Sequence, residues 1–299
     1  MGDNIQSGLL NINLESAADI VNNMIDKFAN AVGWVVTPKG ARKDMEVAIE
    51  TYIEEIQRDS SLPPIIKAYK ISRVRKEIKE YNNMQDILEH ARKFYCKYEG
   101  DVKNESLDND WSMYFYDKAK NVCRDDAKIL WGKILAEECR SEGTIPKSLI
   151  HILSVMNQED AILFENLCGF SPEGIDINGQ VVRLDPLIGD PSIDSLPERY
   201  GLTYNAFQNL EALGLLHYNV VDIRTIFTED VAGKIVQYKY FDSIIEIYDP
   251  QKEFPRGNVV FTRDGAILAN LIEHKRINEF EEYVKNYYEG KNYKVVVKK

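Results

Sequence analysis

The sequence predicts a mainly α-helical protein, in which an N-terminal and central helical bundle precedes a smaller α+β domain with a winged-helix-like order of elements. Apolar residues recur at steps of three and four through much of residues 1–168, which is the pattern of amphipathic helices. Glycine and proline gather in the stretch 171–195, as they do in loops. Runs of β-branched and aromatic residues, typical of strands, follow that stretch.

These patterns divide the 299 residues into four segments. We expect an N-terminal helical region at 1–100, a central helical domain at 101–170, a loop or linker at 171–195 and a winged-helix-like domain at 196–299. A chain of this length is long enough for two or three domains that each bury a core.

Three helices are expected in the N-terminal region. The first covers residues 14–32 and follows Asn13, a residue type that caps helix N-termini. The second runs from about residue 42 to 59 and ends at the Ser-Ser-Leu-Pro-Pro sequence of residues 60–64. The third continues to about Tyr98, and its apolar spacing is close to that of antiparallel or short coiled-coil packing.

Acidic and polar residues are expected to begin the helices of the central domain. Asp110 or Ser112 starts the first helix, and Asp125 or Asp126 caps the second. From there on, helices are predicted at residues 127–139, 148–156 and 159–167.

The last hundred residues mix helical and strand-like patterns. A helix at 204–213 ends at Gly214. Strand-like runs are predicted at 218–227, 234–248 and 258–262, and helices at 262–271 and 277–288, before a short basic tail.

The order helix, glycine, strands, helix is typical of a winged helix-turn-helix, in which 204–213 would be the recognition helix. This helix offers Asn205, Gln208 and Asn209 for contacts with base edges. It also carries Glu211 and has no lysine or arginine, so its attraction to phosphate would be weak. DNA binding and a protein-interaction form of the same shape both stay open.

The strongest basic run of the chain lies between residues 67 and 79. The formal net charge of −11 disfavours nucleic-acid binding by the surface as a whole, but a local basic patch is compatible with it. The run is our candidate site for nucleic acid, anionic lipid or an acidic partner, and a simple solvated helix face is the alternative. Its members are Lys67, Lys70, Arg73, Arg75, Lys76 and Lys79.

Catalytic motifs are absent from the sequence. It contains no GxGxxG, GxxxxGK[ST], HExxH or GxSxG. Clustered acidic residues such as Asp108, Asp110 and Asp117 are more typical of helix starts than of a cation site. We therefore predict no catalytic residue, no metal site and no cofactor, although an active site assembled from distant residues stays open.

Cysteine usage and hydropathy indicate a cytoplasmic protein. The four cysteines lack CxxC spacing, which favours free thiols. The N-terminus lacks a signal-peptide pattern, and no stretch approaches the ~20 apolar residues of a membrane span. A role at the membrane surface stays open for residues 14–32, although their acidic polar face disfavours it.

The most distinctive part of the chain contains two tryptophans twenty residues apart. Asp110 and Trp111 precede the acidic pair 125–126 and the run Leu-Trp-Gly-Lys-Ile-Leu-Ala-Glu at 130–137. This resembles the "DW … D … LWxxxLAxE" element of the bacterial and phage-associated DUF2806 family, which is similar to proteins described as Abi-alpha-like. The residues of this signature, which we expect to be structural, are Asp110, Trp111, Asp126, Leu130, Trp131, Leu135 and Glu137.

The rest of the chain resembles the family more loosely. Residues 145–149 occupy the place of its "PGSxSxRTL" stretch but lack the glycine and the arginine, and residues 261–268 are similar to its "LTxxGxxL". The resemblance implies a setting in prophages or phage defence and supplies no catalytic residue.

Three functions follow as hypotheses. The favoured one is a non-enzymatic interaction protein, in phage defence or abortive infection, that associates with itself or with a protein partner. The alternatives are a nucleic-acid-binding regulator, through the winged-helix-like domain or the basic run, and a peripheral membrane effector.

Overall fold

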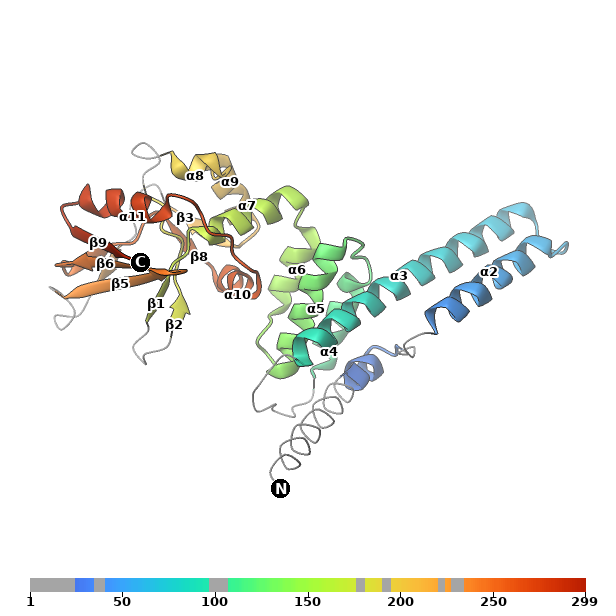
Figure 1. Cartoon of the computed structure of the whole chain (residues 1–299). Coiled ribbons are helices and arrows are strands. Elements are labelled where there is room, and N and C mark those ends of the chain that lie inside the picture. Colours follow the sequence, from blue (N-terminus) through green and yellow to red (C-terminus); the bar gives the residue numbers. More distant parts are fainter. Residues whose placement is uncertain are drawn as a thin grey trace, which may run out of the picture. The chain divides into compact units, whose positions relative to one another are not determined.

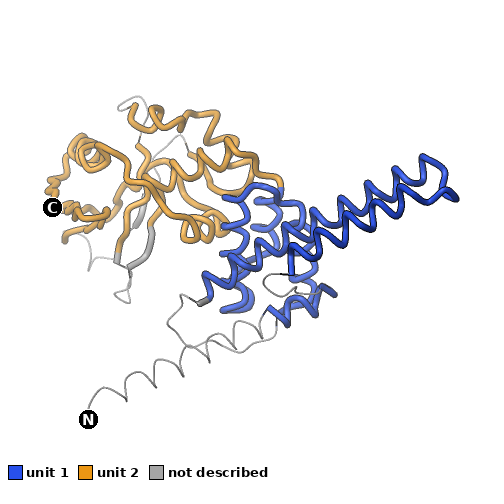
Figure 2. The backbone as a smooth tube through the Cα atoms, turned by 45° about the vertical axis from the view of Figure 1, so that its right-hand side comes forward, with its two compact units in different colours: residues 1–154 blue, residues 155–299 orange. Residues whose placement is uncertain are grey.

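The computed structural model describes residues 25–34, 41–96, 107–175, 181–189, 195–219, 224–226 and 234–299. They belong to two compact units, residues 1–154 and residues 155–299, which Figure 2 colours separately. The regular elements described in the first unit are helices, and the second unit combines helices with antiparallel strands (Figure 1). A mainly α protein with an α+β part is therefore confirmed. Within the described ranges, no helix combines the length and the apolar character that crossing a bilayer requires.

Unit 1 is built from helices close to those that periodicity predicts. Residues 25–31 are helical, and the preceding part of the helix expected at 14–32 lies outside the described residues. The remaining helices are α2 (Arg42–Arg58), α3 (Pro64–Cys96), α4 (Asn109–Ala119), α5 (Asp125–Arg140) and α6 (Lys147–Val155).

Local chemistry explains the turn between α2 and α3. The carboxylate of Asp59 accepts hydrogen bonds from the backbone N–H of Ser61 at 2.8 Å and from its hydroxyl at 2.5 Å. Pro64 then occupies the first position of α3, where a missing N–H costs nothing. The two helices form a hairpin whose far end lies well away from α4, α5 and α6 (Figures 1 and 2).

The starts of α4 and α5 differ slightly from expectation. Asp108, rather than Asp110 or Ser112, caps α4, because its carboxylate accepts the N–H of Trp111 at 2.6 Å. Asp125 and Asp126 both lie in the first turn of α5, after Arg124 at the N-cap position. Carboxylates in a first turn still stabilise the helix through its dipole.

Unit 2 contains further capped helices. Asn157 caps the first of them in a reciprocal capping box with Asp160. Thr203 and Thr262 cap the N-termini of two others through their hydroxyls. The helices are α7 (Gln158–Gly169), α8 (Leu196–Arg199), α9 (Tyr204–Ala212), α10 (Arg263–Leu271) and α11 (Phe280–Glu289).

The strands of unit 2 form three antiparallel groups. The largest has the order β2-β1-β5-β6-β9, while β3 pairs with β8 and β4 pairs with β7. The bounds are β1 (Glu173–Ile175), β2 (Val181–Arg183), β3 (Leu216–Tyr218), β4 (Arg224–Ile226), β5 (Ile235–Tyr240), β6 (Ser243–Tyr248), β7 (Glu253–Pro255), β8 (Val259–Phe261) and β9 (Lys294–Lys298).

Strands β5, β6 and β9 of this sheet differ from the sequence-based expectations. The run 234–248 is a hairpin rather than one strand, and Phe241 makes its tight turn with φ 51°. The expected basic tail is strand β9, which pairs with β6 along its whole length. The inner face of β5 and β6 packs against α11, for example where the rings of Tyr240 and Phe280 lie 4.2 Å apart.

Candidate interaction surface

The tryptophans of the signature lie in the core of unit 1. Trp111 and Trp131 are buried on either side of Phe115, whose ring centroid lies 5.1 Å from that of Trp111 and 5.3 Å from that of Trp131. Phe28 adds an edge-on contact with Phe115 at 5.8 Å. Leu135 is also fully buried. These side chains hold α4 and α5 together and leave no aromatic face for a ligand.

A polar contact completes this part of the core. The indole Nε1 of Trp111 donates to the carbonyl oxygen of Ile145 at 2.7 Å. The carboxylate of Glu138 accepts the N–H of Ile145 and that of Gly143, both at 2.7 Å. Burial raises the pKa of Glu138, and these two hydrogen bonds act in the opposite direction.

The remaining signature residues lie at the surface or partly covered. Asp110 and Asp126 are exposed, and Asp126 forms an ion pair with Arg124. Leu130 is half-buried. Glu137 is half-buried and ion-paired with Arg140, and burial raises its pKa. The signature thus accounts for packing and helix starts in unit 1.

The close contact at Gly132 is a feature that sequence patterns did not predict. A Cβ atom at this position of α5 would lie 2.5 Å from the Cβ of His90 and 2.9 Å from the carbonyl oxygen of Ile87, both in α3. Such distances are well below van der Waals contact, so only glycine fits here. Glycine therefore sets how closely α3 and α5 approach each other.

The basic run lies along the first half of α3, and half of its members are engaged within the chain. Lys67 donates to the carbonyl of Gln57 at 2.7 Å, Arg73 pairs with Glu77 at 2.8 Å, and Lys76 lies 3.6 Å from Glu80. The other three are exposed and form no ion pair with a described residue. They are Lys70, Arg75 and Lys79.

The same hairpin exposes large apolar side chains. Ile65 is 74% exposed, Tyr69 63% and Val47 68%, and Tyr52 and Ile66 are exposed as well. A single exposed apolar residue is ordinary, but several on two neighbouring helices indicate an interaction surface. Ile65 and Tyr69 do not belong to the apolar series on the side of α3 that faces α2. Their position outside this series is the sequence signal that could have revealed their exposure.

On each helix of the hairpin, the side that carries the exposed apolar side chains also carries charged residues further along. At 3.6 residues per turn, Val47 shares an exposed side of α2 with Glu50 and Glu54, whereas Ile53 and Ile56 are buried. On α3, steps of four and three residues lead from Ile65 and Tyr69 to one serine and then to two lysines of the basic run. These residues therefore lie along the same side of the helix. We call these two stripes, taken together, the hairpin surface: Val47, Glu50 and Glu54 on α2, and Ile65, Tyr69, Ser72, Lys76 and Lys79 on α3.

Helix α9 presents a polar surface. Asn205, Gln208 and Asn209 are exposed, and Tyr204 beside them is exposed too. Glu211 turns back to accept the N–H of Tyr218 at 3.2 Å. The helix therefore offers amide groups and a ring but no positive charge.

Among the described residues, no group of three or more His, Cys, Asp or Glu side chains is placed to hold a metal ion.

Residues 70–285 match the model of a family described as a protein of unknown function, DUF2806. No curated protein and no solved structure matches the chain.

Proposed function

Since the chain belongs to the DUF2806 family, whose description names no activity, we propose its function from the surface that the α2–α3 hairpin presents. The protein is a non-enzymatic interaction protein that assembles with further copies of itself through the hairpin surface. The exposure of Val47, Ile65 and Tyr69 is the observation that carries this proposal. Burying a side chain of this size fully stabilises a contact by about 1.5–3 kcal/mol.

Spacing and charge favour a second copy as the partner. Val47 and Glu54 are seven residues apart, and so are Tyr69 and Lys76. When α2 of one copy lies parallel to α3 of the next, apolar side chains meet at one end and a carboxylate meets an ammonium group one heptad further on. This contact replaces or extends the exposed pairs that Glu54 forms with Arg58 at 2.7 Å and Lys76 with Glu80 at 3.6 Å. Two copies that make this contact reciprocally form a closed two-fold dimer, because Val47 of each copy then meets Tyr69 of the other.

Other partners fit the hairpin surface less well. Nucleic acid or anionic lipid would attract the basic run but would leave Val47 without a contact. It would also bring Glu50 and Glu54 near phosphate groups, which repel them. An apolar stripe with carboxylates on one helix and ammonium groups on the other is better matched by the same pattern in another copy.

The test is the mass of the chain in solution. Light scattering at about 0.1 mM should give an oligomer that Ile65→Glu with Tyr69→Glu converts to a monomer, because charges at a contact core are costly. Ile162→Glu is the matched control, since Ile162 is an exposed isoleucine of α7 outside the hairpin. A monomeric wild-type chain, or equal oligomers in all three, would overturn the proposal.

The setting that we propose is phage defence or abortive infection. Its support is family membership together with the signature of residues 110–137, which resembles that of phage-associated proteins. The intact gene with its native neighbours should lower phage plating efficiency, and the Ile65→Glu, Tyr69→Glu variant should restore it. Equal plating with and without the gene across a broad phage panel argues against this setting.

A second candidate function is nucleic-acid binding by a winged-helix-like domain within residues 196–299. The order α8, α9, β3, with β8 antiparallel to β3 and Gly201 at φ 78° in the turn between the helices, supports this shape. Duplex binding should then weaken steeply with salt and fall with Gln208→Ala and Asn209→Ala. If neither salt nor these substitutions change the affinity for the duplex, α9 is excluded as the recognition helix.

A further inference from the structure

Strand β9 forms one edge of the large sheet of unit 2. It pairs with β6 on one side, and no described strand pairs with it on the other. An edge strand presents a row of backbone N–H and C=O groups that another extended chain can bind. At its two ends β9 carries Lys294 and Lys298, and between them three consecutive valines.

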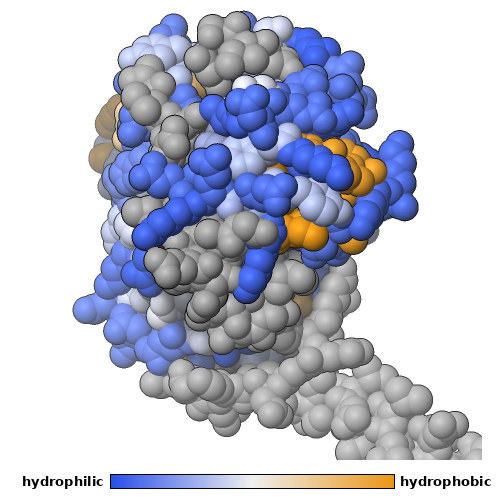
Figure 3. Space-filling model, turned by 90° about the vertical axis from the view of Figure 1, so that its left-hand side faces the viewer, coloured by the Kyte–Doolittle hydropathy of each residue, from blue (hydrophilic) through white to orange (hydrophobic). Residues whose placement is uncertain are grey.

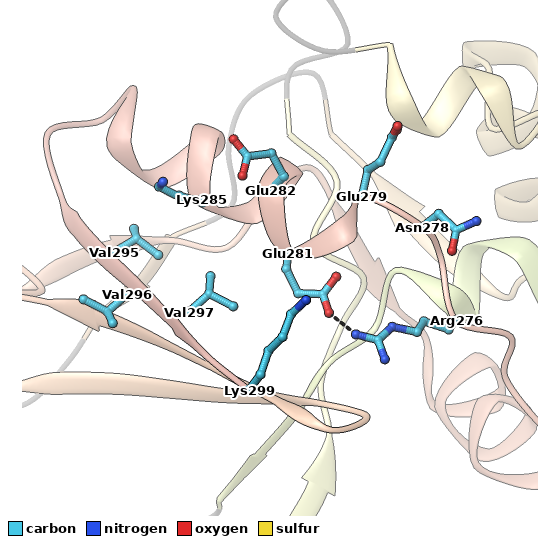
Figure 4. Close-up of a pocket in the computed structure, with 10 residues that line it drawn as sticks. All are labelled: Arg276, Asn278, Glu279, Glu281, Glu282, Lys285, Val295, Val296, Val297 and Lys299. Carbon is cyan, nitrogen blue, oxygen red and sulfur yellow. Dashed lines mark hydrogen bonds and ion pairs between the residues drawn. The ribbon is translucent and has the colours of Figure 1, made fainter.

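A hollow of about 650 Å³ follows this edge. It is lined by Val295, Val296 and Val297 together (Figure 4). Successive side chains of a strand point to opposite faces of the sheet, so a hollow that contacts all three includes the edge itself. No described strand therefore occupies the place where the next strand of the sheet would lie.

Helix α11 forms the other wall of the hollow. Glu281, Glu282 and Lys285 line it from this helix, as Figure 4 shows. The buried ring of Phe280, against Tyr240, and the ring of Tyr288, 6.4 Å from that of Tyr238, fix the helix to β5 of the sheet. A firm helix beside an open edge strand is the arrangement by which several domains bind extended peptides as an added strand.

The charges in the hollow favour an acidic ligand. Arg276 forms an ion pair with Glu281, and Glu279 pairs with Arg199 at 2.6 Å, so these groups are already neutralised. The lining groups that form no ion pair with a described residue are Glu282, Lys285 and Lys299. On the strand, Lys298 pairs with Glu246 at 2.7 Å, so the positive charge that prevails along the edge comes from Lys285, Lys294 and Lys299.

A second copy of β9 is a poor occupant of the same edge. Antiparallel pairing about Val296 places Lys294 of one copy opposite Lys298 of the other, and like charges directly opposite destabilise a pair. An apolar segment with carboxylates at its ends would instead place opposite charges together. Figure 3, which views the molecule from its left-hand side in Figure 1, shows a compact hydrophobic patch bordered by hydrophilic side chains.

We propose that the groove between β9 and α11 binds an extended peptide segment with apolar and acidic side chains, which pairs with β9 as a sixth strand. Main-chain hydrogen bonds to β9 hold the segment, the valines contact its apolar side chains, and Lys285 and Lys299 bind its carboxylates. This site is independent of the hairpin surface.

The probe is a fluorescein-labelled heptapeptide, Glu-Val-Thr-Val-Thr-Val-Glu, added to the full chain. Two further forms carry N-methyl groups on alternate peptide nitrogens, so that only one of them blocks the N–H groups that face β9. We expect saturable binding of the parent peptide, a loss of at least about tenfold for one methylated form, and little change for the other. Hydrogen exchange at the β9 amides should slow when the parent peptide binds.

Substitutions in the protein provide the second arm of the test. Lys285→Glu with Lys299→Glu should weaken binding of the parent peptide at least about tenfold, which is about 1.4 kcal/mol. Lys252→Glu is the matched control, because Lys252 is exposed and lies outside the groove. The proposal is overturned if the parent peptide fails to saturate at about 1 mM, if both methylated forms bind equally, or if β9 is protected only by a second copy of the chain.

Discussion

The indole N–H of Trp111 and the carbonyl oxygen of Ile145 form a buried hydrogen bond of 2.7 Å that ties α4 to the loop between α5 and α6. Glu138 binds the N–H of the same residue, so both polar groups of Ile145 are satisfied by side chains of the signature region. The first tryptophan of the signature therefore combines apolar packing with a specific backbone contact. This explains why tryptophan suits the position better than another aromatic residue.

Trp111→Phe should lower the free energy of unfolding by about 1–3 kcal/mol. Phenylalanine keeps most of the apolar contact with Phe115 but leaves the carbonyl of Ile145 without its donor, and an unpaired buried polar group is costly. Urea unfolding of the full chain measures the change. Tyr204→Phe, at an exposed ring on α9, is the control and should change stability by less than about 0.5 kcal/mol. Equal stability of Trp111→Phe and the wild type would contradict this role.

Gly132→Ala should destabilise unit 1 by about 1–3 kcal/mol, although alanine is the better helix former. The added methyl group would meet the backbone of α3, which can move only if the two helices separate. Thermal unfolding is a sufficient measurement. A raised melting temperature would show that α3 and α5 are less closely packed than described.

Stability should fall at low pH because of Asp86. Burial alone would raise the pKa of this carboxyl, but hydrogen bonds from Lys128 at 2.7 Å and Arg42 at 2.9 Å bring it below the ordinary value of 3.8. A lowered pKa in the folded state means that the ionised form stabilises the fold above 3.8. That contribution is lost as the pH falls through the lower pKa of the folded state.

Asp86→Asn tests this dependence. Near neutral pH the variant should be less stable than the wild type by about 1–3 kcal/mol, because Lys128 is buried and loses its counter-charge. The difference should shrink as the pH falls from 3.8 through the lower pKa of the folded state, because the wild-type carboxyl then becomes protonated and loses its charge. A difference that stays constant with pH would assign the effect to packing.

Most helices could be predicted because each carries its signal locally. The capping box at Asn157 and Asp160 and the Thr262 cap need only neighbouring residues, and both are present in the structure. Strands depend on distant partners. The pairing of Glu173 with Lys239 brings β1, within the stretch expected to be a loop, into the sheet, and no local pattern encodes it.

The candidate surfaces were predictable only in part. The basic run was visible because six cations stand close together in the sequence. Its apolar continuation at Ile65 and Tyr69 required knowledge of which side of α3 faces α2, and that side is set by Ile53 and Ile56 on the other helix. The closeness of Gly132 to α3 likewise follows from the crossing of α3 and α5, which are separated in the sequence by α4.

Complementary charge reversals test self-assembly through the hairpin surface most directly. One chain carries Glu50→Lys and Glu54→Lys on α2, and the other carries Lys76→Glu and Lys79→Glu on α3. Each alone places like charges at the contact between copies, so each should sediment as a monomer. An equimolar mixture restores opposite charges at every contact and should assemble again, whereas a mixture that stays monomeric, or single variants that assemble like the wild type, would contradict the account.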